Sequence, residues 1–339
     1  MRRPVGAELA REPYSWTQFA GWSPDGHFAI VGRGWESPEN GAWEEEHRTF
    51  RFNEAWLYDM YLVDIRTGAA RNVTSVERVS HYNTGLFFLP GQPPRLGFQA
   101  LIDGNSHPFS MDLDGRNKKD LTTGGEGFTY GFSASPDGQF VSYHKDYQVY
   151  VGPADGTEAH RIETGNPFNF APQWSPDGQW LLFVSGERLN CDPYVVRPDG
   201  SGLRQVASRN GYQGWVAVFD VYDFHDGSSD VPVWAADSRG IYYTALFEDR
   251  VELMWAGVEG ETRRLTQSAA GVLHYHPKVS PDGRWLVFGS THDGARALYV
   301  RPSDPVQESG TPYRLTDAAP GTAAMWAAWQ PDSATIRTA

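Results

Sequence analysis

Trp174-Ser175-Pro176-Asp177-Gly178 is the segment that decides the fold, because the chain repeats it. Ser-Pro-Asp-Gly recurs at residues 23–26, 135–138 and 280–283. Proline presets φ at the first corner of a tight turn, aspartate accepts hydrogen bonds from the backbone ahead of it, and glycine takes the position with positive φ. Each copy therefore predicts a tight turn between two strands.

The residues after each turn are apolar without interruption, as in 180–184 (Trp-Leu-Leu-Phe-Val) and 285–288 (Trp-Leu-Val-Phe). A strand that is apolar on both sides is buried on both faces. A third strand follows, for example residues 297–300, and an outer strand such as 264–266 completes the unit. Each repeat thus predicts a four-stranded antiparallel meander covered on both faces, which is typical of a β-propeller blade.

Degenerate copies of the turn bring the number of repeats to seven, with anchors at positions 24, 90, 136, 176, 236, 281 and 331. The intervals between these anchors are 66, 46, 40, 60, 45 and 50 residues, a spacing typical of propeller blades. We therefore expect an all-β, seven-bladed propeller in a single domain, residues 1–339, with six blades as the alternative. Residues 5–12 resemble an outer strand, and we expect these N-terminal residues to close the ring.

Composition restricts the partners and the compartment. The chain has 29 Lys and Arg against 42 Asp and Glu, a net charge of -13, which argues against nucleic acid and anionic membranes as partners. Cys191 is the only cysteine, so no intramolecular disulfide can form. With no signal-like N-terminus, we expect a cytoplasmic protein, or a periplasmic one if a signal peptide has been removed. A homo-oligomer stays open.

Two insertions account for the long intervals. They cover residues 34–53, with a run of glutamates that includes Glu36 and Glu44, and residues 208–230. In a meander, the loop from the second to the third strand emerges on the same face as the blade-to-blade connection, and long loops often carry function. We interpret the glutamate run as a solvated loop, with a calcium site as the alternative. The insertions could equally cover the rim or form a dimer contact.

His274-Tyr275-His276-Pro277 begins an inner strand, six residues before Asp282 counted from His276. Residues i and i+2 of a strand point the same way, so both imidazoles could reach one metal ion. Asp230, His225 or His81 would complete the shell. Such a set suits a divalent metal, with manganese favoured and calcium, nickel, iron or zinc as alternatives. The competing interpretation is a pair of structural histidines bonded to neighbouring loops.

The repeats resemble the TolB-type (PD40) propeller repeat over nearly the whole chain. Two segments resemble oligogalacturonate lyases more narrowly: one from His81-Tyr82-Asn83 to residues 135–137, the other from His274 to Val300. This resemblance implies a propeller enzyme with a divalent metal, usually manganese, held by histidines and a glutamine, and a histidine that removes the C5 proton of a uronate. Gly271 stands where that glutamine is expected, and Asp230 lies near the position of a missing histidine.

The sequence therefore favours a metal-dependent, carbohydrate-active lyase that acts by β-elimination on a small acidic, uronate-containing oligosaccharide. The base would be His81 or His292, and Lys145 and Arg33 would contact the substrate carboxylate. Aromatic side chains that could stack on sugar rings are Trp35, Tyr130 and Trp215. The alternative is a non-catalytic TolB-like propeller that binds a protein or a glycan on the same face.

Overall fold

A computed structural model describes residues 15–51, 55–122, 127–214, 230–306, 312–317, 323–325 and 327–331, and the backbone of 336–337. The regular secondary structure of the described chain is almost entirely β-strand, with one helix. It divides into two compact units, one ending at Arg161 and one beginning at Ile162. No described helix is long and apolar enough to cross a membrane.

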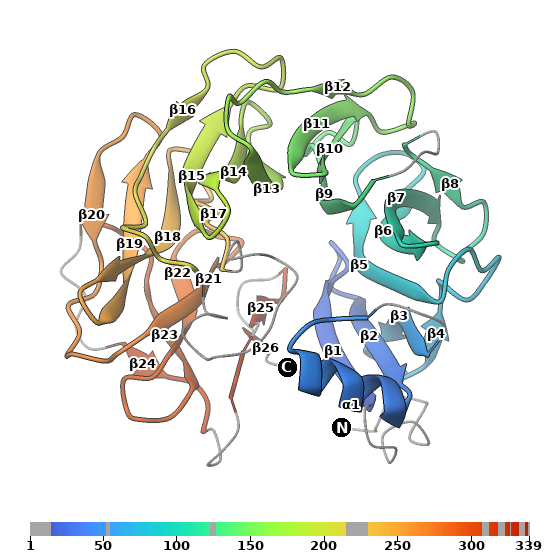
Figure 1. Cartoon of the computed structure of the whole chain (residues 1–339), viewed down its shortest axis with the longest axis horizontal. Helices are drawn as coiled ribbons and strands as arrows, with labels where there is room; N and C mark the ends of the chain where they lie inside the picture. The colour runs from blue at the N-terminus through green and yellow to red at the C-terminus, as the bar shows by residue number, and fades with distance from the viewer. Residues whose placement is uncertain are drawn as a thin grey trace. The chain divides into compact units, whose positions relative to one another are not determined.

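The first unit contains three antiparallel meanders, each with its strands in chain order (Figure 1). One residue pair, Tyr58 with Tyr82, joins the first two meanders as a parallel bridge. The strands are β1 (Ser15–Trp22), β2 (Phe28–Glu36), β3 (Trp56–Asp64) and β4 (Ala70–Asn72); β5 (Tyr82–Leu89), β6 (Arg95–Ile102), β7 (Asn105–Asp112) and β8 (Lys119–Asp120); and β9 (Thr129–Ala134), β10 (Phe140–Lys145), β11 (Gln148–Pro153) and β12 (His160–Arg161).

The second unit contains three more meanders and a strand pair. The strands are β13 (Phe168–Trp174), β14 (Leu181–Glu187), β15 (Asn190–Val196) and β16 (Arg204–Gln205); β17 (Val233–Trp234), β18 (Gly240–Phe247), β19 (Arg250–Gly257) and β20 (Thr262–Arg264); β21 (His274–Val279), β22 (Trp285–Ser290), β23 (Ala297–Pro302) and β24 (Tyr313–Arg314); and β25 (Ala328–Trp329) with β26 (Ile336–Arg337). The predicted all-β class and four-stranded antiparallel units are confirmed. The number of blades and the single domain stay predictions, and the predicted closing strand, residues 5–12, lies outside the described residues.

The Ser-Pro-Asp-Gly turns form as their chemistry predicts. In the turn before β22, the Ser280 hydroxyl donates to Asp282 Oδ1 over 2.6 Å and accepts from Trp285 N over 3.0 Å. Gly283 has φ 72° and donates its N–H to Ser280 O. The donors from Ser280 and the Arg284 backbone lower the pKa of the Asp282 carboxyl to about 2. The turn is therefore held by its own side chains.

The strand that follows each turn is buried on both faces, as its unbroken apolar run predicts. In β14, Leu181 to Val184 are each at most 1% exposed, although successive side chains point to opposite faces. Leu182 and Val195 of this meander share a core cluster with Ile241 of the next meander, and Leu253 shares one with Phe288 of the meander after that. Each unit's core therefore lies between successive meanders.

A bulge interrupts the first strand of several meanders. The register shifts at β5, β9, β13 and β21, and each bulge contains one residue in the left-handed region. Three of these residues are Gly85 (φ 62°), Gly131 (φ 65°) and Ala171 (φ 52°), small residues at a position that disfavours large ones. The fourth is His276, with φ 50°. A side chain as large as histidine is thus the exception at this position.

Threonines in the connections between meanders accept hydrogen bonds from backbone N–H groups of the third strands. Thr74, Thr266 and Thr316 accept hydrogen bonds from the N–H groups of Met60, Leu253 and Leu298, at 2.9–3.0 Å. Two of these threonines also donate to a buried carboxylate one residue earlier on the strand: Thr74 to Asp59 over 2.9 Å, and Thr266 to Glu252. In the third case, that of Thr316, the residue before Leu298 is Ala297, which has no carboxylate.

The insertion at residues 34–53 contains helix α1 (Pro38–His47), where the sequence predicted a solvated loop. Ser37 caps the helix by accepting from Asn40 N over 3.2 Å. The Asn40 side-chain amide donates to Glu36 Oε1 over 2.7 Å and to Glu44 Oε1 over 3.2 Å, and both carboxyl groups are buried. Burial raises the pKa of the Glu36 carboxyl. Part of the glutamate run is therefore a packing surface rather than a solvated one.

We expect Thr266→Val to destabilise the protein by about 2–3 kcal/mol, because it leaves the buried Glu252 carboxylate without one of its donors. Thr316→Val is the matched control, since Ala297 replaces the carboxylate there, and it should cost about 1 kcal/mol. Urea unfolding followed by tryptophan fluorescence measures both. Equal losses in the two variants would show that the carboxylate adds nothing to the connection.

Candidate functional site

The bulge in β21 separates the two predicted histidine ligands. Between Tyr275 and Lys278 the register with β22 shifts, so the regular alternation of side chains along the strand is lost. His274 and His276 consequently contact different carboxylates: His274 lies near Glu252, and His276 lies beside Asp230. The expectation that i and i+2 point the same way fails here because it assumes an unbroken strand.

His276 and Asp230 form a buried pair. Asp230 Oδ1 accepts from the His276 backbone N–H over 2.6 Å and lies 3.5 Å from His276 Nδ1. The Asp230 side chain is fully buried, and the His276 side chain is 10% exposed. Asp230 also has a left-handed backbone, with φ 67°. The structure thus brings together two of the residues that the sequence predicted as partners, and two strained residues meet at the contact.

The second oxygen of Asp230 is also bound. Asp230 Oδ2 accepts from Thr244 Oγ1 over 2.7 Å and from the Tyr212 hydroxyl over 3.2 Å. Burial, and the Asp230 charge next to it, raise the pKa of Tyr212 well above its usual value, so the hydroxyl keeps its proton and remains a donor. These contacts fix the carboxylate in one orientation toward His276.

Arg209 supports the pair through hydrogen bonds to the backbone. It was not predicted from the sequence. It is 1% exposed, and its guanidinium donates to the backbone oxygens of Asp230 and Thr244, both over 3.3 Å. The same group lies 4.7 Å from the centre of the Tyr212 ring. Its position inside the long insertion at 208–230 was the one sequence signal that could have suggested it.

His274 is held in the connection from the preceding meander. Its Nε2 is 2.8 Å from Ser268 Oγ, which donates in turn to Glu252 over 3.2 Å. In the first unit Asn83 takes the same place and donates to Asp59 over 3.1 Å. Burial lowers the pKa of His274 to about 4, so the imidazole is neutral at pH 7. These contacts match the competing interpretation of a structural histidine bonded to a neighbouring loop.

The other predicted residues belong to other elements of the chain. His292 is half-exposed in the turn from β22 to β23, and His81 is exposed directly before β5. Arg33 and Trp35 are on β2, where Arg33 is buried, and Lys145 ends β10. Trp215 and His225 lie outside the described residues.

A metal site is not complete among the described residues. No three His, Cys, Asp or Glu side chains converge in that part of the chain. Asp230 already accepts three hydrogen bonds, and His274 Nε2 is bound to Ser268. His274 Nδ1 is buried without a hydrogen-bond partner there, but it does not belong to a group of three side chains that could hold a metal ion. The described donor set therefore does not fit the metal that the sequence resemblance implies.

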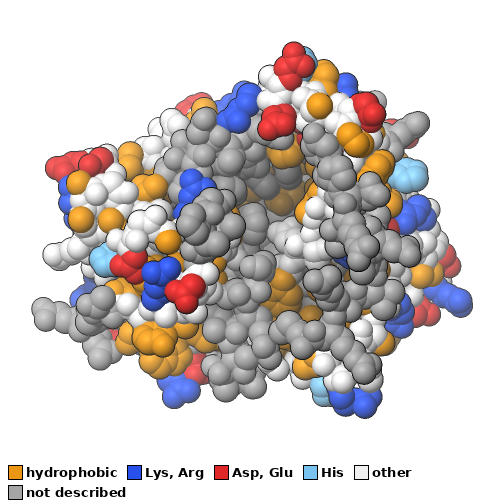
Figure 2. Space-filling model, turned by 90° about the horizontal axis from the view of Figure 1, so that it is seen from below, with side chains coloured by type: hydrophobic (Ala, Val, Ile, Leu, Met, Phe, Trp, Pro, Cys, Tyr) orange, Lys and Arg blue, Asp and Glu red, His pale blue; other side chains and the backbone are white. Residues whose placement is uncertain are grey.

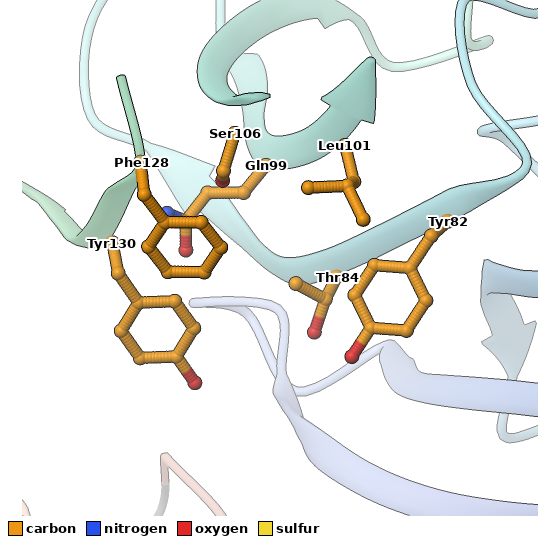
Figure 3. Close-up of a pocket in the computed structure, with 7 residues that line it drawn as sticks. All are labelled: Tyr82, Thr84, Gln99, Leu101, Ser106, Phe128 and Tyr130. Atoms are coloured by element: carbon orange, nitrogen blue, oxygen red, sulfur yellow. The ribbon is translucent and has the colours of Figure 1, made fainter. Parts of the chain in front are cut away.

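Tyr130, a predicted sugar-stacking residue, lines a small pocket in the first unit (Figure 3). The ring of Phe128 lies nearly parallel to that of Tyr130, at 11°, with centroids 6.5 Å apart. The pocket is formed by side chains from β5, β6, β7 and β9 and from the residue before β9. They are Tyr82, Thr84, Gln99, Leu101, Ser106, Phe128 and Tyr130. Of these residues only Tyr130 was predicted from the sequence, because Gln99 and Phe128 reach the pocket through strand register alone.

Charges on the described surface are mixed. On the face in Figure 2, acidic and basic side chains lie next to one another rather than in patches of one sign. Arg204 pairs with Glu259 at 3.2 Å, and Arg314 lies 3.6 Å from Asp293. On the face shown, individual cations beside carboxylates, rather than a basic patch, are thus what an acidic ligand would meet.

Sequence comparison finds relatives that match parts of the chain, and no family model matches it. TolB of the Tol-Pal system from Syntrophus aciditrophicus is 36% identical over 90 residues, 26% of this chain and 20% of that protein. An uncharacterized peptidase from Bacillus subtilis is 28% identical over 165 residues, 46% of this chain and 21% of that protein. An uncharacterized Agrobacterium fabrum protein is 26% identical over 163 residues, 43% and 54% of the two chains. The matches thus span a fifth to about half of these relatives.

Solved structures match over nearly the whole chain. An oligogalacturonate lyase in complex with manganese has a TM-score of 0.63 at 16% identity, covering 95% of this chain and 86% of that one. The enzyme from Vibrio parahaemolyticus has a TM-score of 0.61 at 13% identity, covering 94% and 84%. A puromycin-hydrolyzing peptidase from Mycobacterium tuberculosis reaches 0.61 at 15%, covering 95% and 48%. At these identities the similarity shows the fold. The predicted TolB-like propeller with resemblance to oligogalacturonate lyase is confirmed.

His274→Asn should change how stability depends on pH. The folded pKa of about 4 lies below the usual 6.5, so His274 contributes stability that is fully present above pH 6.5 and is lost as the pH falls toward 4. That contribution is on the order of 3 kcal/mol. Asparagine can replace the contact to Ser268 without titrating, so the variant should lose less stability between pH 7.5 and 4.5 in urea unfolding. His292→Asn is the exposed control; parallel pH profiles for wild type and His274→Asn would contradict the assignment.

Proposed function

We propose that this chain is a lyase that cleaves uronate-containing oligosaccharides by β-elimination, with His276 as the base. The observation that carries the proposal is His276 itself: an imidazole only 10% exposed, at a bulge position where three other meanders have Gly85, Gly131 and Ala171, next to a fully buried carboxylate. Strained residues persist where surrounding contacts enforce them, and such residues cluster at active sites. The lyase-like sequence segments and the fold similarity support the same reaction.

The pair suits proton abstraction. A carboxylate beside Nδ1 favours a proton on that nitrogen, which leaves Nε2 as the basic atom. Nε2 is itself buried, so the proposed step requires the side chains that cover it to move when the substrate binds. In the proposed step, Nε2 takes the C5 proton of the uronate, the C–H electrons form the C4–C5 double bond, and the C4–O bond breaks. The leaving oxygen then gains a proton from the imidazolium or from water. Asp230 stabilises the imidazolium, and the donors Thr244 and Tyr212 keep it aligned.

For binding of the acidic substrate, the sequence predicts Arg33 and Lys145 as contacts for the uronate carboxylate, and Trp35 and Tyr130 as side chains that stack on sugar rings. Neutralising that carboxylate makes the C5 proton more acidic. Manganese, which the sequence resemblance implies, stays a prediction from sequence, and no step above depends on it.

The second candidate is a non-catalytic propeller that binds a protein or a glycan. The observation that favours it is the full use of Asp230, which accepts three hydrogen bonds within its own unit as a structural carboxylate does. On this view the pair would only hold the bulge of β21 in place. The two candidates differ in whether His276 can be replaced without loss of a chemical activity.

Absorbance at 235 nm detects the unsaturated product, which hydrolysis does not form. We expect wild type to produce it from an oligouronide panel with Mn²⁺ in the buffer, and His276→Gln to lose at least 100-fold in kcat because a general base is removed. Asp230→Asn should lose less, since its amide oxygen can still accept from His276 N.

His81→Gln and His292→Gln are the matched controls, because both side chains are accessible and both were predicted as bases. They should keep most of the activity. Product formation that survives in His276→Gln but fails in either control would move the base to that residue. A wild type that forms no product from any oligouronide would favour the binding protein.

A further inference from the structure

Lys278 is a cation that lies two residues beyond His276 on β21. It is the one exposed residue of this strand, and the others are buried or partly buried. Its backbone oxygen accepts from Trp329 Nε1 over 3.1 Å. Its ammonium group makes no hydrogen bond or ion pair with any residue that the structure describes. The proposed base is thus followed, on the same strand, by a cation that solvent reaches.

The place of Lys278 in its meander is a structural one elsewhere in the chain. Lys278 is the first residue to pair with the second strand after the bulge. The residues at the same place in β5, β9 and β13 are Phe87, Ser133 and Gln173. Ser133 Oγ lies 2.9 Å from Ser142 Oγ. Gln173 Nε2 donates to Pro232 O over 3.2 Å. Of the four, Lys278 alone is charged, and it alone is exposed.

The charge of Asp230 has no cationic partner of its own in the described chain. Its carboxylate accepts from two hydroxyl groups and one backbone N–H, all of them neutral donors. The buried guanidinium of Arg209 donates to backbone oxygens instead. A second carboxylate brought to this place would therefore be repelled unless a cation accompanied it. An acidic substrate needs such a cation near His276.

Lys278 lies within reach of this charge. Solvent reaches its side chain, yet burial among nearby protein atoms lowers the pKa of the ammonium group, and the Asp230 charge raises that pKa. The two groups form no ion pair, so the ammonium protons stay available to a ligand. A carboxylate ligand would favour the charged form of Lys278 further.

The proposed elimination requires a base and a cation side by side. In a uronate the carboxylate carbon is bonded directly to C5, the atom that loses its proton. A base at C5 therefore needs the cation for the carboxylate close to it. Strand β21 supplies both within one bulge, whereas Arg33 and Lys145, the contacts predicted from the sequence, belong to the other unit.

We infer that Lys278 binds the carboxylate of the uronate residue that loses its C5 proton. The inference rests on the proposed function and deepens it, because it makes the free acid rather than its methyl ester the substrate. The ammonium group donates charge-assisted hydrogen bonds to the carboxylate. It also stabilises the negative charge that spreads onto the carboxylate as the C5–H bond breaks.

Two ligands that differ only in this carboxyl group test the inference: methyl α-D-galactopyranosiduronate and its methyl ester. Titration of the full-length protein, followed by NMR, gives both affinities. We expect wild type to bind the acid about tenfold or more tightly than the ester. Lys278→Met keeps most of the side-chain volume without the charge, so it should lower affinity for the acid about tenfold and leave the ester nearly unchanged. Lys278→Arg should keep the preference for the acid.

Lys119→Met is the matched control, because Lys119 is an exposed lysine of β8 that donates to Asp155 O. It should bind both ligands like wild type. If Lys278→Met fails to fold, Lys278→Gln is the second uncharged variant. A preference for the acid that survives in the uncharged variant overturns the inference, as does its loss in Lys145→Met alone. A wild type that binds both ligands equally, or neither, also overturns it.

The titration is independent of cleavage, because neither ligand carries a sugar at C4 that could leave. Binding as expected, without any product at 235 nm from longer oligouronides, would contradict the lyase proposal and support the role of Lys278. Product formation by a Lys278→Met variant with unchanged affinity for the acid would do the reverse.

Discussion

A single backbone constraint, the left-handed residue in the bulge of a meander's first strand, shapes both units. The bulge adds one residue that the neighbouring strand does not match, so the chain must turn back through positive φ. At β5 the residue is Gly85, where a Cβ would lie 3.2 Å from Gln99 Oε1. At β21 it is His276, whose N–H donates to Asp230. The same distortion thus requires a small residue in one unit and positions an imidazole in the other.

Buried polar groups in the connections keep these bulges in register. Asp59, on a third strand, accepts from the connection threonine Thr74 and from Asn83 at the start of the next meander. Glu252, also on a third strand, accepts from Thr266 and from Ser268, which contacts His274 at the start of the next meander. Asp192 has the same role before the fifth meander, where it accepts from Arg209 N over 2.6 Å. The Arg209 side chain continues to the backbone of Asp230. A buried carboxylate left without these donors is costly, so the network specifies a single arrangement of the candidate site.

Sequence reasoning succeeded where local chemistry determines structure. The turn from Ser280 to Gly283 and the doubly buried strand at residues 181–184 could be predicted because proline, aspartate, glycine and unbroken apolar runs act within a few residues. It failed where long-range register decides. The bulge turned His274 toward Ser268 and away from His276, and strand pairing, which no local pattern reveals, brought Gln99 to Tyr130. Helix α1 was missed although Ser37-Pro38 is a capping signal, because the glutamates suggested exposure.

The central claim is that His276, aligned by Asp230, removes the C5 proton of a uronate. An oligouronide deuterated at C5 tests this most directly, since the bond that breaks in the proposed step is the one that carries the label. The account predicts that the wild-type protein forms the product absorbing at 235 nm, and forms it severalfold more slowly from the deuterated substrate. Product formed at the same rate from both substrates, with that rate unchanged in His276→Gln, would contradict it.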